Sequence, residues 1–258
     1  MGLSSRSVQA IEADTASDLA STANGADHIT ISHADFLSEA QRLADYRATQ
    51  DLRAMAVDVQ DVYDEFGYGI VGAAPIRDFL AYAYSNWQPQ APSYVVLFGD
   101  GHYDPKNYLG YGTTSYIPPY LAPVDPWLVE TAADNQYVTV VGDDRMPDMM
   151  LGRLAVNSLA EATAFVDKII AYEQATPSAW QEHVLAVTDN PDSGGNFSDL
   201  SDDLLNNHLP AAPYQATRVY YGITHSTVAE TRTAIQDGIN AGALFVKKRT
   251  KSSYYFVV

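Results

Sequence analysis

The sequence predicts an α/β fold in which a mostly parallel sheet carries helices on both faces. Short apolar runs alternate along the chain with amphipathic stretches of roughly 10–18 residues, which is the pattern of successive βαβ units. Several of the apolar runs end directly in Gly or Asp, as strands do where the chain turns away from a sheet. With 258 residues and 47% hydrophobic content, the chain can bury the core of one large domain or of two small ones.

The expected elements follow one another regularly from residue 27 onward. The expected strands are residues 28–31, 55–59, 94–98, 137–141, 150–156, 184–188, 218–221 and 243–246. The expected helices are residues 35–50, a helix opened by Pro75, and residues 158–175, 198–209 and 227–240. A turn-rich passage at residues 64–74 precedes the helix opened by Pro75.

Local signals support these helices. The stretch 35–50 carries its apolar residues on one face, at the spacing of an α-helix. Pro75 is favoured at a first helical position because its fixed φ suits the helix and its missing N–H is not needed there. Residues 158–161 and 227–230 each form a capping box, in which a hydroxyl and a Glu carboxylate satisfy the first backbone N–H groups.

The two ends of the chain differ in composition from its body. We predict a flexible leader at residues 1–26, an α/β body at 27–246 with halves at 27–157 and 158–246, and an aberrant tail at 247–258. Four of the 15 Lys and Arg residues fall within residues 247–251. Consecutive ammonium groups are costly to bury without partners. We therefore expect the strand at 243–246 not to continue, and the sheet to be incomplete at its C-terminal end.

Charge and composition exclude several classes of function. A net charge of −17 disfavours nucleic acid and anionic membrane surfaces, because binding to phosphate depends on clustered Lys and Arg. No apolar run approaches the length of a membrane span, and the N-terminus lacks the apolar core of a signal peptide. The chain contains no cysteine, so a disulfide, a thiolate metal site and a cysteine nucleophile are excluded within it.

Acidic residues follow the expected strand at 94–98, where parallel strands place functional groups. Asp100 and Asp104 lie in a loop shaped by glycines, and two interpretations stay open: oxygen ligands for a metal, or an acidic turn. His102, between them, is either a general base or a structural histidine.

A second acidic stretch contains Asp134, Asp143, Asp144 and Asp148. Four carboxylates within fifteen residues suit a hard cation such as Ca²⁺, although their spacing does not follow an EF-hand loop. The alternative is a solvated loop in which Arg145 pairs with one acid. Asp189 follows the strand at 184–188 and could orient a catalytic imidazole, or it could be an ordinary turn residue.

Several runs together resemble the gingipain-type cysteine peptidases of family C25, in the caspase-like clan. The similar runs are YVVLFGDGHYDPKNY at 94–108, IPPY at 117–120, ETAADN at 130–135, PDMMLGR at 147–153, VTDN at 187–190, VDVQDVYDEF at 57–66 and IRDF at 76–79. They cover about residues 27–246 in the order that the family has. The resemblance implies a caspase-like α/β fold and thiol proteolysis of protein or peptide substrates, with no cofactor required for catalysis.

The resemblance also implies roles for single residues. Asp189, or its neighbour Asn190, matches the strand end that carries the acid orienting the catalytic His. Asp192 or Asp199 matches an acid of the substrate pocket, and the acidic loops resemble stretches that hold structural Ca²⁺ (ligand candidates Asp100, Asp104, Asp134, Asp143, Asp144 and Asp148). Family members are secreted or surface proteins of bacteria, so an extracellular location and further domains of a larger exported protein are expected.

In the family, the strand matching 243–246 runs into a Gly-His-Gly motif, and the nucleophilic Cys follows the next strand. Lys and Arg stand at that place here, so we expect this chain to be an inactive, truncated peptidase region. Two alternatives stay open. One is a non-catalytic pseudo-peptidase that binds partners in a surface or secretion assembly. The other is a metal-assisted hydrolase using Asp100, His102, Asp104 and the cluster at Asp143.

Overall fold

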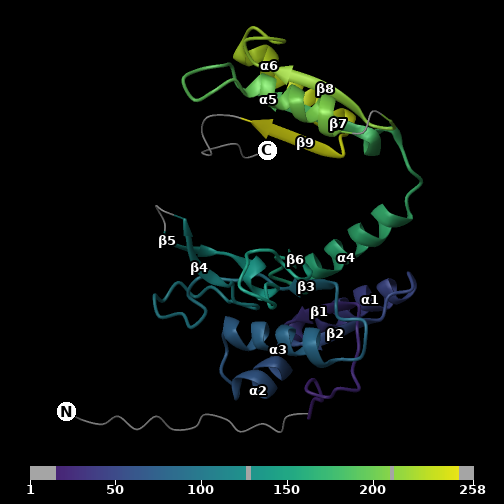
Figure 1. Cartoon of the computed structure of the whole chain (residues 1–258), viewed down its shortest axis with the longest axis vertical. Helices are drawn as coiled ribbons and strands as arrows, with labels where there is room; N and C mark the ends of the chain where they lie inside the picture. The colour runs from purple at the N-terminus through teal and green to yellow at the C-terminus, as the bar shows by residue number, and fades with distance from the viewer. Residues whose placement is uncertain (1–15, 126–128, 210–211, 250–258) are drawn as a thin grey trace, which may run out of the picture. The chain divides into compact units, whose positions relative to one another are not determined.

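The computed structural model describes residues 16–125, 129–209 and 212–249. It divides into two compact units, one ending at Gln174 and the other beginning at Ala175 (Figure 1). Every pairing within the sheets of four and three strands is parallel, and helices cover both faces of each sheet. The predicted fold class, a mostly parallel α/β fold with helices on both faces, is confirmed.

The first unit is built on a four-stranded parallel sheet with the order β2-β1-β3-β6. Its strands are β1 (His28–Ser32), β2 (Ala54–Asp58), β3 (Tyr94–Phe98) and β6 (Met150–Leu154). Its helices are α1 (Leu37–Ala48), α2 (Val59–Gly67), α3 (Ala73–Asn86) and α4 (Leu159–Gln174), with 3-10 turns at Ala34–Phe36 and Asp134–Tyr137. A separate antiparallel hairpin pairs β4 (Leu121–Asp125) with β5 (Val129–Ala132).

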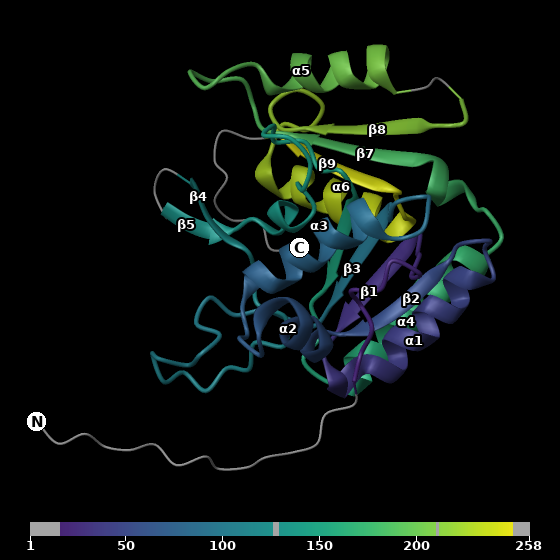
Figure 2. The ribbon, with the colours of Figure 1, turned by 60° about the horizontal axis from the view of Figure 1, so that its bottom comes forward.

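Alternating side chains of this sheet enter two different cores. Odd-numbered residues such as Ile31 and Leu97 pack with α2 and α3, around the buried Phe79. Even-numbered residues such as Phe98 pack with α1 and α4, beside Leu43. Figure 2 shows α1 and α4 side by side. A sheet buried on both faces explains why its strands read as almost continuous apolar runs.

The second unit is a three-stranded parallel sheet with the order β8-β7-β9. Its strands are β7 (His183–Thr188), β8 (Gln215–Tyr220) and β9 (Phe245–Arg249), and its helices are α5 (Phe197–Asp203), α6 (Val228–Ala241), a 3-10 turn at Ala179–Glu182 and a π-helical turn at Leu204–His208. Buried Leu205 packs on the face of Ala186. Gly238 of α6 comes so close to Leu185 that an added Cβ would lie 2.8 Å from it, so α6 covers the opposite face. The predicted capping box at Thr227 and Glu230 is confirmed at the start of α6.

The expectation that the basic run ends the last strand is wrong. β9 continues through Lys247 and Lys248 to Arg249, and it pairs with β7 along its whole length. Within the described residues it is an edge strand of its sheet, a position where charged residues are tolerated. Lys247 is the register partner of Ala186 on β7 and donates a hydrogen bond to Ser201 Oγ at 2.9 Å, so its ammonium group is not left unpaired. The residues of the predicted tail from 250 to 258 lie outside the described residues.

The predicted strand at 137–141 is also wrong. Asp134–Tyr137 is a 3-10 turn, and side chains rather than a neighbouring strand satisfy the backbone beyond it. Arg77 donates to the Gln136 and Thr139 carbonyl oxygens, and Asp148 Oδ2 accepts the N–H groups of Val140 and Val141. An apolar, β-branched run looks like a strand in sequence, but its backbone partners are decided by the tertiary structure.

Two further differences concern the start of the chain and α2. Part of the predicted flexible leader is packed: Leu19 and Ala26 are buried, and Trp87 Nε1 donates to the Leu19 carbonyl oxygen. The helix α2 replaces the first part of the predicted turn-rich passage. Asp58 caps it by accepting the Gln60 N–H at 2.9 Å. The predicted division of the body between residues 157 and 158 stays a prediction. In the structure, α4 belongs to the first unit, where it packs against α1.

Candidate functional site

The carboxyl edge of the second sheet is the candidate site. Strands β7, β8 and β9 are parallel, so the loops that follow them meet at one edge. From β7 the chain crosses to β8 on one side, and it then returns to β9 on the other side. The junction between β7 and β9 is therefore a topological switch point, where open α/β sheets bind their ligands.

Asp189 lies at this switch point. It follows the last residue of β7, and its backbone N–H donates to the Arg249 carbonyl oxygen at 3.1 Å, which ties the loop to the end of β9. Its Oδ1 accepts the Asn190 N–H at 3.0 Å. Asp189 as a residue is half-buried. Its role as an acid that orients a catalytic side chain stays a prediction.

The neighbouring loop after β8 brings a histidine to the same edge. The Tyr221 N–H donates to the Thr188 carbonyl oxygen, and the Gly222 N–H donates to that of His225. Gly222 has φ of +76°, and an added Cβ would lie 3.1 Å from Asn190 Cβ, so the two loops touch. His225 Nδ1 hydrogen-bonds Thr224 Oγ1 at 2.9 Å. The sequence reasoning did not single out His225, whose only signal was its place shortly after an expected strand.

Asp192 and Asp199 occupy turn positions beyond Asp189. Asp192 Oδ1 accepts the Gly194 N–H at 2.6 Å in a tight turn that Gly195 closes. Asp199 lies in the first turn of α5, where the capping residue Asn196 accepts its N–H. Both acids are exposed. Their role in a substrate pocket stays a prediction.

A polar network lies under α5 on one face of this sheet. Asp202 accepts hydrogen bonds from Arg218 Nε at 2.7 Å and from the buried Tyr220 hydroxyl at 2.9 Å. The hydrogen bond from Arg218 lowers the pKa of Asp202, against the opposing effect of burial. Desolvation lowers the pKa of Lys247, which lies on the same face. The network joins α5 to β8.

In the first unit, Asp100 and Asp104 hold the loop after β3. Asp100 accepts the Gly101 N–H at 2.9 Å and the Asn157 amide at 3.1 Å. Asp104 is buried and accepts the N–H groups of Tyr108 and Leu109 at 2.9 and 2.7 Å. Gly101 is required here, because an added Cβ would lie 2.5 Å from the Ile117 carbonyl oxygen. Through these contacts, both acids hold the backbone of the loop after β3.

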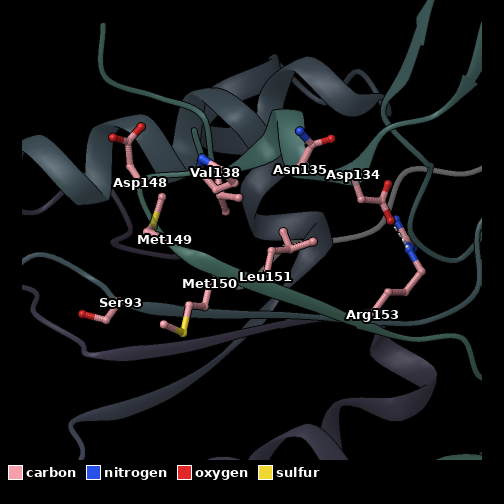
Figure 3. Close-up of a pocket in the computed structure, with 10 residues that line it drawn as sticks. Ser93, Asp134, Asn135, Val138, Asp148, Met149, Met150, Leu151 and Arg153 are labelled. Carbon is pink, nitrogen blue, oxygen red and sulfur yellow. Dashed lines mark hydrogen bonds and ion pairs between the residues drawn. The ribbon is translucent and has the colours of Figure 1, made fainter. Parts of the chain in front are cut away.

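The second acidic stretch lies along an open pocket of about 870 Å³ beside β6 (Figure 3). Asp134 faces Arg153 with an Oδ2–Nε distance of 2.7 Å, while Asp148 lies at the other end of the pocket. Asp144 accepts the Met146 N–H at 2.9 Å, and Asp143 is exposed. The structure thus distributes the four carboxylates along a loop instead of gathering them around one point.

Two surveys bear on metals and membranes. Across the residues that the structure describes, no group of three or more His, Asp or Glu side chains is placed to hold a metal ion. The calcium ligands and the residues of a metal-assisted hydrolase therefore stay predictions without an assembled site. Over the same described residues, no helix combines the length and hydropathy that crossing a membrane requires.

The parallel sheets with helices on both faces define the class of the protein, an α/β domain. The particular family follows from the sequence: the model of peptidase family C25 matches residues 21–247, and the chain belongs to this family. The resemblance drawn from the motifs at 94–108 and 187–190 is thereby confirmed. A search of curated proteins found no match.

Solved structures give two further likenesses. One is the crystal structure of dimeric latent PorU from Porphyromonas gingivalis, with 28% identity, a TM-score of 0.47, and coverage of 58% of this chain and 16% of that one. The other is described as the structure of a protease, with 20% identity, a TM-score of 0.46, and coverage of 62% of this chain and 31% of that one. The chain thus spans less than a third of each of these proteins.

Proposed function

We propose that this chain is a cysteine-type endopeptidase domain that supplies the α/β scaffold and the acid of a thiol catalytic site. The observation that carries the proposal is the position of Asp189 at the switch point, in a chain of family C25. Asp189 accepts a hydrogen bond from the catalytic imidazole, holds its ring orientation and stabilises its protonated form. The imidazole belongs to the segment that the family places after the strand matching β9.

The chemistry also limits what these residues do alone. The thiolate is the nucleophile of such a site, and the 258 residues contain no cysteine. An acid that orients a base does not form an acyl-enzyme without a nucleophile. The 258 residues by themselves are therefore proposed to be inactive toward peptides. Substrates of the complete site are proteins or peptides, in an extracellular or cell-surface setting.

A chimera tests the role of Asp189. Residues 1–249 are joined to the segment of an active C25 peptidase that carries its catalytic His and Cys. We expect peptide hydrolysis that iodoacetamide abolishes. Asp189→Asn should lower kcat by about 10²–10⁴-fold with a small change in KM, because the imidazole loses its orienting charge. Asp192→Asn, in the same loop, is the matched control. An Asp189→Asn chimera that keeps full kcat and its circular dichroism spectrum would contradict the proposal.

The absence of cysteine favours a second candidate, a non-catalytic pseudo-peptidase that acts as a binding domain in a surface or secretion assembly. This candidate predicts that the full chain forms a stable, monodisperse protein without any added segment. A chain that stays soluble only when a C-terminal segment is supplied would speak against it. Hydrolysis by the unmodified chain, insensitive to iodoacetamide, would contradict both candidates.

A further inference from the structure

Strand β6 is an edge of the first sheet, with β3 as its neighbour within the described residues. The Leu154 carbonyl oxygen accepts the Gly99 N–H, which directly follows β3, so the even-numbered residues of β6 direct their backbone groups toward β3. Backbone groups of successive residues point to opposite sides of a strand. The N–H and C=O groups of Leu151 and Arg153 therefore point away from β3, and none of them has a hydrogen-bond partner among the described residues.

The pocket of about 870 Å³ lies along this strand (Figure 3). One wall is β6 with the preceding Met149, and the opposite wall contains Asn135 and Val138. The opposite wall satisfies its own backbone, since the Asp148 N–H donates to the Val138 carbonyl oxygen at 2.8 Å. Within the described residues the two walls do not pair with each other. Open space thus separates β6 from the backbone across the pocket.

Strand β6 also lacks the features that usually protect an edge strand, such as outward lysines or a proline. The edge strand β9 of the second sheet carries Lys247, Lys248 and Arg249. The sequence of β6 is MLGRL, and its one charged residue, Arg153, pairs with Asp134 at 2.7 Å. An edge strand with unpaired backbone groups and no protecting charge is a template for pairing with another chain.

The middle of the pocket is apolar. Val138 and Met149 are buried, and the half-buried Leu151 projects toward Val138 (Figure 3). Alternate residues of a strand point to the same face of a sheet. A strand added beside β6 therefore places apolar side chains on this surface at every second residue.

One end of the pocket is negatively charged. Asp148 Oδ2 accepts two backbone N–H groups, but Asp148 has no cationic partner and its Oδ1 accepts no hydrogen bond among the described residues. The exposed Asp143 and Asp144 lie in the same loop, with Arg145 as its one cation. In a chain of net charge −17, this end favours a basic side chain over an acidic one.

We propose that this pocket binds an extended basic peptide, which adds a strand to the first sheet. The backbone of the peptide hydrogen-bonds the free N–H and C=O groups of Leu151 and Arg153, an apolar side chain packs on Val138, and a Lys or Arg side chain pairs with Asp148 Oδ1. In strand addition, backbone hydrogen bonds give affinity and side-chain pockets give specificity. The site belongs to the first unit and does not depend on the proposed peptidase function.

The test uses the full chain with the probe acetyl-Ser-Lys-Val-Thr-Val-Ser-amide, in NMR titrations that follow the backbone amides. We expect saturable shifts with a Kd on the order of 0.1 mM, and slower amide exchange at Leu151 and Arg153. Mass spectrometry of the recovered peptide separates binding from hydrolysis.

Modified peptides test the mode of binding. One peptide is N-methylated at both Val residues and another at Lys and Thr, so each blocks one edge of the added strand. One of the two should bind about 10-fold more weakly than the probe, because it loses backbone hydrogen bonds to β6. The probe with Glu in place of Lys should bind about 5-fold more weakly. Unchanged binding of both N-methylated peptides, or no saturable shift with the probe, would overturn the proposal.

Variants of the chain locate the site. Leu151→Pro removes an N–H from the free edge but none of the hydrogen bonds to β3, and it should abolish binding. Ala56→Pro in β2, the other edge strand, is the control and should leave binding unchanged. The Arg53 carbonyl oxygen accepts the His28 N–H, so even-numbered residues of β2 also point away from their neighbour.

Asp148→Asn keeps an acceptor oxygen but removes the charge. It should weaken binding of the probe about 5-fold and leave binding of a peptide with Gln in place of Lys unchanged. Unchanged probe binding in a folded Leu151→Pro protein would overturn the proposal. If Leu151→Pro fails to fold, unchanged probe binding by Asp148→Asn has the same consequence.

Discussion

Both sheets of this protein bury polar side chains beneath their helices, but the two sheets pair them to different extents. In the first unit, the buried side chains of His28 and Thr30 on β1 each leave an atom without a hydrogen-bond partner. In the second unit, Thr188 Oγ1 on β7 also lacks a partner, but Asp202 accepts hydrogen bonds from both Arg218 and Tyr220. The second network stabilises its unit, whereas the unpaired atoms of β1 cost free energy, about 1–3 kcal/mol for each group.

The apolar cores differ in size, and the larger core belongs to the first unit. The first unit buries two clusters, one on each face of its sheet, that include Phe79, Leu97 and Phe98. The second unit buries a small cluster around Leu205 and leaves Phe245 exposed on β9. A large apolar core tolerates unpaired polar atoms, while a small core depends on its polar network. Stability should therefore reside in packing in the first unit and in hydrogen bonds in the second.

Removing a core aromatic ring tests the first half of this comparison and should have the largest effect. Phe79 is fully buried, with ring centroids 5.4 Å from Phe66 and 5.6 Å from Trp87. Phe79→Ala should lower the free energy of unfolding of the first unit by about 3–5 kcal/mol, since it leaves a large cavity. Urea titration with amide hydrogen exchange measures each unit separately.

The counterpart in the second unit is Leu205→Ala, with an expected loss of about 2–3 kcal/mol that is confined to residues after Ala175. If either substitution destabilises both units equally, the two units unfold as one cooperative body, and the comparison between them fails.

The unpaired histidine makes the first unit sensitive to acid. Its pKa is about 4 in the folded chain, against an ordinary value of 6.5. Between these values the unfolded chain binds a proton that the folded chain does not, so stability falls as the pH is lowered from 6.5 to 4. The loss reaches about 3 kcal/mol at most. Arg47, paired with Glu173, and Tyr94 are the charged and titratable groups around His28.

Urea unfolding of the first unit at pH 7 and at pH 4.5 checks this prediction. His28→Leu should flatten the pH dependence. His208→Leu, at an exposed position in the second unit, should leave it unchanged. A His28→Leu chain with the slope of the natural sequence would assign the acid sensitivity to other groups.

Breaking the polar network should cost less, because Asp202 and Arg218 are partly exposed. Asp202→Ala leaves the Arg218 guanidinium and the buried Tyr220 hydroxyl without their acceptor, and it should lower the stability of the second unit by about 1–2 kcal/mol. Asp203→Ala, the exposed neighbour, should change stability by less than about 0.5 kcal/mol. Equal effects of the two substitutions would show that the network does not stabilise the unit.

Sequence predicted most of the fold because local patterns and tertiary structure agree in most elements. The run at 94–98 is a strand over the predicted residues, and the capping box at Thr227 starts a helix as expected. The predictions of secondary structure failed where residues distant in sequence determine the local conformation. Arg77 and Asp148 supply the backbone partners that turn 137–141 into a loop, and Ser201 accepts the Lys247 hydrogen bond that lets β9 continue.

The candidate site was predictable in part. Asp189 was found because it follows an apolar strand, and the motifs at 94–108 and 187–190 resembled those of one family. Its position between β7 and β9 was not predictable, because strand order depends on how distant segments pair. The row that His28, Tyr94 and Met150 form across β1, β3 and β6 could not be predicted for the same reason. These three residues are far apart in sequence and become neighbours only through the register of the sheet.

The smallest expected effect is the change in Tm on adding calcium. It tests whether the acids of the first unit are already paired within the protein, as Asp202 is in the second unit. Asp134 is paired with Arg153, and Asp148 accepts two backbone N–H groups. Calcium at millimolar concentration should therefore change Tm by no more than about 1 °C relative to EDTA. A saturable rise of more than about 5 °C, lost in Asp148→Asn but kept in Asp100→Asn, would show that the 143–148 loop closes around a cation. In that case the partner of these carboxylates would be a cation, and the contrast with the paired groups of the second unit would extend to this loop.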